Sequence, residues 1–324
     1  MMHKKLALII AYFGELPEYS KVFFNSLNYN PEIDLFLVTD QCVNINIDNL
    51  IVIKKTFSEF KNDVQNLFDF KIVLDTPYKL CDYKPIYGML FKDILYEYPF
   101  WGYCDLDMVL GDVFSFLPEN ILDNYSKIYE YGHLTIYKND PENNRRFMYE
   151  VGMNYQDVFT TKVIKVFDET EGIQRKYELM GIPTYTPRDC ADINPWKYQL
   201  NRVETGISKE KLNSFNHKKQ LFFWENGKIF RGFINPYTHK IEYDSFNYLH
   251  FQKREMKITF PFNSSTKAFF ITNQGIVEKK QGFNIKKEDF KKYNNYNLIR
   301  EISKGLQRYY FIWKRRLLKY IFRR

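Results

Sequence analysis

Short apolar runs that alternate with helical segments are the feature that most limits the folds open to this chain. Residues 5–12, 33–40 and 49–56 are apolar runs typical of buried strands. Residues 19–27 and 57–68 repeat their apolar side chains at helical spacing. Such alternation is typical of an α/β fold with a mostly parallel sheet flanked by helices.

The middle of the chain continues this pattern and then loosens. Residues 79–98 have helical spacing, with an irregular start expected at Pro85. The strand-like run 100–110 follows, and Gly111 allows a tight exit from it. Two further strands and two further helices are predicted, in this order, at 127–131, 133–139, 141–151 and 172–182.

The last third of the chain has one strong local signal. Residues 218–233 predict a β-hairpin, because Asn226-Gly227 favours a tight two-residue turn. Residues 261–303 are polar and hold two more strand-like runs. We therefore expect three parts, which are a domain over 1–258, an extension over 259–303 and a helical tail over 304–324.

The composition favours a packed protein in a reducing compartment. Of 324 residues, 45% are hydrophobic and 19% aromatic, which excludes a disordered chain. Four cysteines without metal spacing are too few for a disulfide scaffold. The apolar run 6–13 lacks a small-residue cleavage site and is followed by Glu15 and Glu18, so we expect a strand there and not a signal peptide.

The net charge of +8 lies almost entirely in the tail. Residues 304–324 carry eight cations and no acid, and the remaining chain has 39 cations and 39 acids. The tail also places apolar and aromatic residues at helical spacing, which predicts a basic amphipathic helix on an anionic membrane surface. The alternative is a helix docked on the protein with a solvated basic face. Because the body is neutral, nucleic acid is not an expected partner.

Two aspartates lie one residue apart within the run 100–110. Side chains alternate along a strand, so Asp105 and Asp107 are expected to share one side while Leu106 faces the other way. Two carboxylates that lie so near each other repel unless a cation lies between them. Mn²⁺ and Mg²⁺ prefer oxygen ligands and keep positions open for substrate phosphates. We therefore predict a metal site that neutralises a diphosphate; the alternative is a pair of solvated aspartates.

Six blocks of sequence together resemble a bacterial family of glycosyltransferases with the GT-A fold, found in capsule and lipopolysaccharide gene clusters. The blocks span about residues 5–254 and read LALIIAYFGELPEY, LFLVTD, YKLCDYKPIYGMLF, FWGYCDLDMVLGDV, GHLTIYKN and YLHFQKR. The resemblance implies a Rossmann-type mixed sheet flanked by helices. More distantly, the chain is similar to galactosyl- and mannosyltransferases that use a sugar nucleotide and a D-x-D metal site.

The resemblance implies a nucleoside site near the start of the chain. It assigns this role to Ala11, Tyr12 and Phe13, and an aromatic ring here would stack on a base at about 1–3 kcal/mol. Asp40 would accept a hydrogen bond from base or ribose. The alternatives are core packing for the two rings and a cap or turn position for Asp40.

The resemblance also implies contacts to the donor sugar, the phosphates and the metal. Asp82 and Lys84 would hold the sugar and phosphate, with a surface salt bridge as the alternative. His250 would complete the metal ligands begun by the two aspartates, and Lys253 would contact the diphosphate. Two carboxylates and one imidazole suit Mn²⁺.

The remaining candidates face the acceptor or the donor. His133 and Asn139, at the two ends of the predicted strand 133–139, are candidate donor or acceptor contacts. The acids Asp168, Glu169 and Asp189 are candidates to bind the acceptor hydroxyl or to act as its base, with Asp192 as an alternative to Asp189. Helix capping is the competing explanation for the pair at 168–169.

Taken together, these residues predict a metal-dependent glycosyltransferase. It would move a sugar from a nucleotide diphosphate, with a UDP-sugar favoured, to a hydroxyl of a capsule, lipopolysaccharide or lipid-linked glycan. The arrangement around His250 favours a retaining reaction. We expect the protein at the inner face of the plasma membrane, on its cytoplasmic side. The alternatives are a metal-dependent phosphotransferase or nucleotide-sugar hydrolase and a non-enzymatic basic binding protein, but the chain has no P-loop motif.

Overall fold

The computed structural model describes residues 5–204, 208–252 and 254–321, which form two compact units. Unit 1 comprises Met1–Ser20, Leu27–Leu106 and Phe114–Arg188. Unit 2 comprises Lys21–Ser26, Asp107–Val113 and Asp189–Arg324. The chain therefore passes from unit 1 to unit 2 inside the Asp105-Leu106-Asp107 motif. None of the helices in the described ranges combines the length and the apolar character that a membrane span requires.

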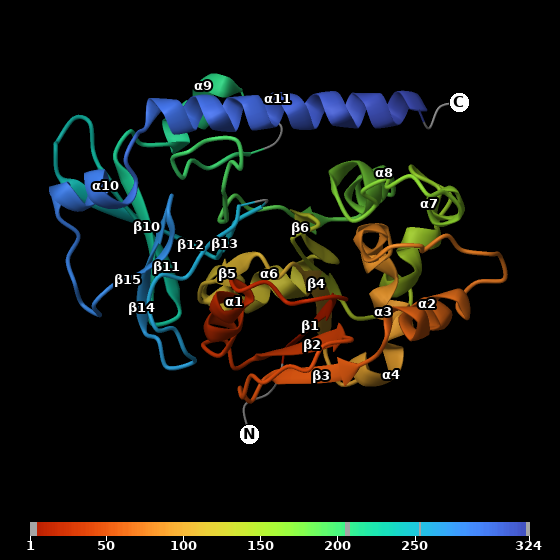
Figure 1. Ribbon diagram of the computed structural model, residues 1–324. Helices are drawn as coiled ribbons and strands as arrows, with labels where there is room; N and C mark the ends of the chain where they lie inside the picture. Colours follow the sequence, from red (N-terminus) through yellow and green to blue (C-terminus); the bar gives the residue numbers. More distant parts are fainter. Residues whose placement is uncertain (1–4, 205–207, 253, 322–324) are drawn as a thin grey trace. The chain divides into compact units, whose positions relative to one another are not determined.

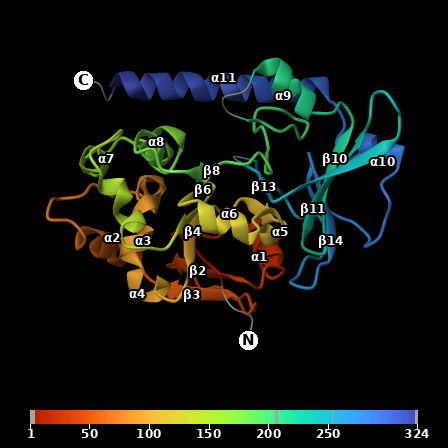
Figure 2. The ribbon, with the colours of Figure 1, turned by 180° about the vertical axis from the view of Figure 1, so that it is seen from behind.

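Unit 1 is built on a seven-stranded mixed sheet. Its order is β3 (Leu50–Lys54), β2 (Ile33–Thr39), β1 (Leu6–Ala11), β4 (Phe100–Cys104), β7 (Leu134–Lys138), β6 (Lys127–Tyr131) and β8 (Thr184–Tyr185). The first four of these strands are parallel, β7 is antiparallel to both β4 and β6, and β8 is parallel to β6. The edge strand β3 is labelled in Figure 1, and the opposite edge strand β8 is labelled in Figure 2. The predicted α/β class and parallel strands are confirmed.

Helices and turns follow the strands of this part of the chain. They are α1 (Ser20–Leu27), α2 (Phe57–Gln65), η1 (Pro77–Asp82), η2 (Lys84–Ile86), α3 (Tyr87–Leu90), α4 (Lys92–Leu95), α5 (Val113–Phe116), α6 (Glu119–Asn124), η3 (Asn143–Met148), α7 (Tyr155–Thr160), η4 (Thr170–Gln174) and α8 (Arg175–Leu179). Among them, α1 belongs almost wholly to unit 2. The strand sequence LALIIA of β1 is almost wholly buried, as expected for a parallel strand covered on both faces. The core joins β1 and β4 to α2 and α3 through buried residues such as Ile9, Phe60, Tyr87 and Trp101.

Three predicted helices of unit 1 are wrong in detail. Residues 79–98 form two 3₁₀ turns and two four-residue helices instead of one helix. Pro85 lacks an N–H and restricts the residue before it, so the segment turns at Lys84. Residues 141–151 contain the 3₁₀ helix η3. The predicted helix over 172–182 is shorter, because the backbone is non-helical at Gly172 within η4 and α8 ends at Leu179.

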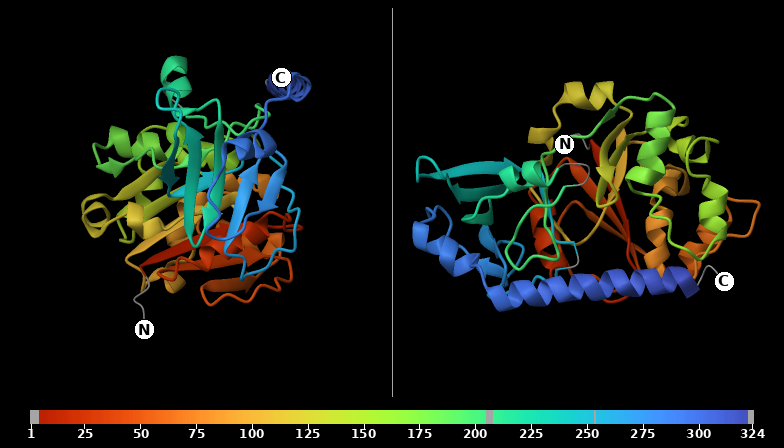
Figure 3. Two further views of the ribbon diagram at one scale, coloured as in Figure 1. Left: turned by 90° about the vertical axis from the view of Figure 1, so that its left-hand side faces the viewer. Right: turned by 90° about the horizontal axis from the view of Figure 1, so that it is seen from above.

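Unit 2 contains a five-stranded antiparallel sheet. Its order is β12 (Ile241–Phe246), β11 (Lys228–Ile234), β10 (Gln220–Glu225), β14 (Ala268–Thr272) and β15 (Gly275–Glu278). The predicted hairpin is confirmed as β10 and β11, with positive φ at Asn226 (46°) and Gly227 (80°) in the turn. The helix α10 (Lys287–Tyr293) packs Phe290 against Leu221, Phe223 and Phe270 of this sheet. Figure 3 shows the sheet in its left-hand view.

A second, three-stranded sheet of unit 2 carries the end of the D-x-D motif. Here β13 (Tyr248–His250) pairs antiparallel with β5 (Met108–Leu110) and parallel with β9 (Ala191–Asp192). The strand-like run 100–110 is therefore two strands in two sheets, β4 and β5, and not one. Gly111, directly after β5, lets the chain pass close to the segment that precedes β13. A Cβ at this position would lie 2.6 Å from the carbonyl oxygen of Phe246.

The tail forms one long helix, as predicted, but it begins earlier. The helix α11 runs over Leu298–Ile321 and is uninterrupted in Figure 3. A shorter helix of unit 2, α9, covers Lys209–Phe215. Asn297 explains the early start, because its side-chain oxygen accepts the N–H of Arg300 at 3.0 Å, as an N-cap does. Large apolar residues of this helix are exposed, and they include Leu306, Tyr309 and Trp313.

Candidate functional site

The carboxyl ends of the parallel strands in unit 1 gather several predicted residues. Ala11 ends β1, Asp40 follows β2, and Asp105 follows β4. The strand β1 lies between β2 and β4, so the strand order reverses there. In open α/β sheets, ligands bind at this edge and at such a reversal. The fold thus gives these residues the expected position.

Lys84 is the centre of a charged cluster at this edge. Its ammonium lies 2.7 Å from Asp105 Oδ1 and 3.0 Å from Asp168 Oδ2 and donates to the carbonyl oxygen of Gly132 at 2.8 Å. The Tyr103 ring lies 5.5 Å from the same ammonium. The side chains of Lys84 and Asp168 are 13% and 3% exposed, whereas that of Asp105 is 37% exposed. Lys84 is therefore a buried bridge and not the surface salt bridge considered above.

Burial controls the protonation of this cluster. Burial disfavours the charged ammonium of Lys84, but the charges of Asp105 and Asp168 outweigh it and hold the Lys84 pKa well above its ordinary value. Burial raises the pKa of Asp168 to about 6, in spite of Lys84. Burial and then the charge of Asp168 raise the pKa of Glu169 to about 7. The Oδ1 atom of Asp168 is buried and has no hydrogen-bond partner among the described residues.

A carboxyl group with a pKa near neutrality is suited to proton transfer. An acid or base works best when its pKa lies near the operating pH. Asp168 and Glu169 meet this condition, and sequence reasoning named both. It did not foresee that Asp168 pairs with Lys84, because residues 84 and 168 come together only through the fold.

Gly132 leaves room for the acidic pair. A Cβ at this position would lie 2.3 Å from Asp168 Oδ2 and 3.1 Å from Glu169 Oε1. Since Lys84 holds the Asp168 carboxylate, that oxygen cannot move aside without losing its ion pair. Gly132 is thus a residue of the cluster that sequence reasoning missed, although it precedes the candidate His133.

Asp82 is held by protein groups on the N-terminal side of Asp168. It is fully buried, and its carboxylate accepts hydrogen bonds from Lys79 at 2.6 Å and from the backbone N–H groups of Lys165 and Phe167. These contacts fix the chain just before Asp168. Asp82 therefore helps to position Asp168 through the backbone that precedes it. Its contact with a donor sugar stays a prediction.

The predicted nucleoside residues divide between the core and the edge of the sheet. Phe13 packs edge-on against Phe57 and Phe60, with ring centroids 5.3 and 5.5 Å away, so it belongs to the core. Asp40 accepts the N–H of Gly14 at 3.0 Å. This hydrogen bond is the largest of the effects that lower the pKa of Asp40. Tyr12 is half-buried, and its contact with a base stays a prediction.

Unit 2 has its own cluster around His250. The Nδ1 atom lies 2.9 Å from Asp192 Oδ1, and the Nε2 atom lies 3.4 Å from Asp107 Oδ1. Gln252 donates to the other oxygen of Asp192 at 2.6 Å. Strand pairing creates this arrangement, because His250 lies beside Met108 on β5 and beside Asp192 on β9.

The donor set of this cluster fits a divalent metal. Ligating histidines commonly use one ring nitrogen for the metal and donate from the other to a carboxylate. Asp192 occupies Nδ1 of His250, and Nε2 faces the carboxylate of Asp107, so an imidazole and a carboxylate oxygen converge. Burial lowers the pKa of His250, but hydrogen bonds to Asp107 and Asp192 outweigh it and raise the pKa to about 10. Sequence reasoning named Asp192 only as an alternative acid.

Three predicted residues are placed without a confirmed role. His133 is buried in the β6–β7 turn, stacks on Tyr131, and its carbonyl oxygen accepts the N–H of Asp105 at 3.0 Å. Asp189 is half-buried just before β9. Lys253 lies outside the residues that the structure describes.

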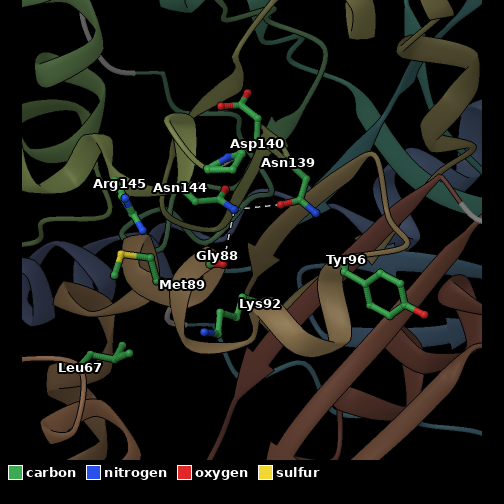
Figure 4. A pocket seen from close by; sticks show the side chains of 10 residues that line it. Leu67, Gly88, Met89, Lys92, Tyr96, Asn139, Asp140, Asn144 and Arg145 are labelled. Carbon is green, nitrogen blue, oxygen red and sulfur yellow. Dashed lines mark hydrogen bonds between the residues drawn. The ribbon is translucent and has the colours of Figure 1, made fainter.

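A cavity of about 510 Å³ in unit 1 is lined by one candidate residue, Asn139, and by none of the other candidates. Figure 4 shows that Asn144 points toward Asn139 and Gly88 in its wall. The amide groups of Asn139 and Asn144 donate to protein oxygens, and Asn144 accepts from Trp101 at 2.6 Å. Because these polar groups are occupied by protein partners, the cavity does not add to the candidate site.

The fold places the chain among α/β proteins with an open mixed sheet, and charged side chains gather at the carboxyl edge of its parallel strands. The chain belongs to a family of unknown function (DUF6625), whose profile matches residues 8–280. No curated protein matches it.

Two solved glycosyltransferase structures resemble the chain weakly. One is the glycosyltransferase GlyE of Streptococcus pneumoniae TIGR4, with 10% identity and a TM-score of 0.34 over 58% of this chain and 46% of GlyE. The other is mouse xyloside xylosyltransferase 1 in its apo form, with 9% identity and a TM-score of 0.40 over 79% of this chain and all of that one. The chain spans less than half the length of GlyE.

Proposed function

We propose that this chain is a metal-dependent glycosyltransferase that uses a nucleotide-diphosphate sugar. One observation carries the proposal: the two aspartates of the D-x-D motif are each held in a charged cluster, Asp105 by Lys84 and Asp107 by His250. The side chains of Asp105 and Asp107 are 37% and 21% exposed, and among the described residues their partners are side chains and not backbone amides. Burial against backbone amides would count against a metal role.

The proposed metal ligands are Asp105, Asp107 and His250. Asp105 joins the other two through the chain itself, because only Leu106 separates it from Asp107 and two residues span at most about 7 Å. A bound Mn²⁺ or Mg²⁺ would supply Lewis-acid stabilisation of the diphosphate leaving group. Asp192 orients His250, and Lys84 orients Asp105.

The other residues are assigned to the donor and the acceptor. Ala11, Tyr12 and Asp40 line the carboxyl edge of the sheet and would contact the nucleoside, for which uridine is favoured. Asp168 and Glu169 have pKa values near neutrality and would bind the acceptor hydroxyl or exchange its proton. We favour a retaining reaction on a hydroxyl of a capsule, lipopolysaccharide or lipid-linked glycan.

A screen of sugar nucleotides tests the reaction. The full chain is incubated with UDP-, GDP- and CMP-sugars, with Mn²⁺ or with EDTA, and release of the nucleotide is followed. Metal-dependent release with one donor, lost in Asp107→Asn and kept in the exposed-surface variant Asp123→Asn, supports the proposal. Equal release by wild type and Asp107→Asn contradicts it. Product analysis by NMR then gives the anomeric configuration and separates transfer from simple hydrolysis.

We further propose that the tail 304–324 lies on the anionic inner face of the plasma membrane. Its described residues expose Leu306, Tyr309 and Trp313 beside cations such as Arg308 and Lys314. Flotation with vesicles that contain phosphatidylglycerol tests this partner. Chains with and without residues 304–324 that float equally would contradict the proposal.

A further inference from the structure

A cavity of unit 2 collects cations that the proposed reaction does not use. It has a volume of about 590 Å³ and is lined by Tyr198, Arg254, Glu255, Arg300 and Lys304, among others. The volume is within the range of pockets that bind small organic ligands. Three of these five side chains are cationic, and Glu255 is exposed.

Arg254 forms the buried base of this cavity. It is 6% exposed, and its guanidinium donates to the carbonyl oxygens of Asn194 at 3.1 Å, Lys197 at 2.6 Å and Tyr198 at 2.8 Å. These acceptors are neutral, so they fix the plane of the guanidinium without cancelling its charge. A guanidinium held in this way is suited to a phosphate or carboxylate.

The first turns of α11 form one wall. Arg300, Ser303, Lys304 and Gln307 line the cavity at spacings of three and four residues, which places them on one helix face. The guanidinium of Arg300 lies over the Tyr198 ring, 5.2 Å from its centroid, and is thus held at the rim. The hydroxyl and amide of Ser303 and Gln307 add neutral hydrogen-bond donors.

The charges around the cavity do not cancel. The carboxylate of Glu301 accepts the N–H of Tyr198 and lies 3.7 Å from Lys197. Its charge acts on Lys197 and also reaches the buried Arg254. Burial and then the charge of Arg254 lower the pKa of Lys304, which places these two cations within electrostatic reach of each other. Two acids, Glu255 and Glu301, thus lie near four cations, which are Arg254, Arg300, Lys304 and Lys197. The cavity and its surroundings therefore carry a net positive charge.

We propose that this cavity binds the phosphate or diphosphate group of an organic anion. Three cations and two neutral donors converge on a space larger than a phosphate, so the anion carries a further substituent. Two sources share this chemistry, namely the headgroup of an anionic lipid and a soluble phosphate ester. The site is independent of the proposed transferase reaction, and it needs no metal.

Calorimetry with inorganic pyrophosphate in EDTA tests the site on the full chain, and the EDTA keeps a metal-bound diphosphate from contributing. The pocket variant is Arg300→Gln with Lys304→Gln. The matched control is Arg308→Gln with Lys314→Gln, which removes the same charge from exposed positions of α11 outside the cavity. We expect the pocket variant to weaken binding about tenfold or more and the control less than about twofold. Melting curves by circular dichroism confirm the fold.

A second variant guards against misfolding. Ser303→Glu places a carboxylate at an exposed position of the cavity wall and removes no cation, so it should repel the anion. Flotation with vesicles of phosphatidylcholine and phosphatidylglycerol is run on wild type, both pocket variants and the control. The control removes two cations of the tail proposed above to bind the membrane, so its own loss of flotation gives the effect of tail charge, and only a larger loss by the pocket variants counts. Selective loss by the pocket variants in flotation identifies a lipid headgroup, and selective loss only with pyrophosphate identifies a soluble ester. If the pocket variants and the control behave alike in both assays, the proposal is overturned.

Discussion

His250 and Asp192 face each other across paired strands, with 2.9 Å between Nδ1 and Oδ1. The pairing of β13 with β9 sets this contact. A carboxylate in this position fixes the ring of a ligating histidine and raises its basicity. Asp192 therefore acts on the proposed metal through His250, as a positioning residue.

The first prediction concerns this pair. Asp192→Ala should weaken Mn²⁺ binding about 10–100-fold, because His250 loses the partner that orients its ring. Titration calorimetry of the full chain with Mn²⁺ measures the change. Asp123→Asn, an exposed acid, is the control and should leave the affinity unchanged. An unaltered Mn²⁺ affinity in Asp192→Ala would show that His250 does not need this partner.

The second prediction concerns the Lys84 bridge. Lys84→Met removes the counter-charge of the buried Asp168, and loss of one partner of a buried pair costs about 3–5 kcal/mol. The loss should be largest at pH 8. It should shrink near pH 5, because the raised pKa of Asp168 lets its carboxyl take up a proton and become neutral. Urea unfolding at both pH values measures the difference.

A double variant checks the cause. Lys84→Met with Asp168→Asn leaves no buried charge without a partner, so it should be more stable at pH 8 than Lys84→Met alone. If the second substitution adds a further loss, the Lys84–Asp168 pair is not the origin of the effect.

The third prediction concerns Gly132. Gly132→Ala would place a Cβ 2.3 Å from the held oxygen of Asp168, so we expect a loss of about 1–3 kcal/mol in unfolding free energy. Gly305→Ala is the matched control. No atom lies within 4 Å of a Cβ at this position in α11, so it should be neutral or stabilise by up to about 1 kcal/mol. Equal stability of Gly132→Ala and wild type would mean that the cluster can shift freely.

The fourth prediction concerns the buried Lys127, which donates to Gln174 Oε1 at 2.9 Å. Burial lowers its pKa to about 7, whereas an unfolded lysine titrates near 10.4. Between these values the unfolded chain binds more protons, so its unfolding free energy should rise with pH by up to about 1.4 kcal/mol per unit. Unfolding curves at pH 7, 8 and 9 should show this slope.

Two substitutions isolate the contribution of that side chain. Lys127→Met removes the group that titrates, so the rise in unfolding free energy between pH 7 and 9 should become smaller. Lys162→Met alters a side chain that is 84% exposed and should leave the slope as it is. The same slope in all three chains would place the titrating group elsewhere.

Local sequence determined much of this protein. The apolar runs that became β1, β2 and β3, the Asn226-Gly227 hairpin and the basic helix α11 were readable, because each depends on neighbouring residues. The spacing of Asp105 and Asp107 is likewise fixed by the covalent chain. Even the exceptions are local in part, since Pro85 broke the predicted helix over 79–98 and Asn297 started α11 early.

Only the tertiary structure decided which charges meet. The residues around Lys84 in the sequence do not predict its pairing with Asp168, and those around His250 do not predict its pairing with Asp192. Strand order and register bring these side chains together. The run 100–110 became strands of two different sheets for the same reason. Such pairings depend on how the whole core packs, and a buried charge takes the partner that the packing offers, because leaving it unpaired costs several kcal/mol.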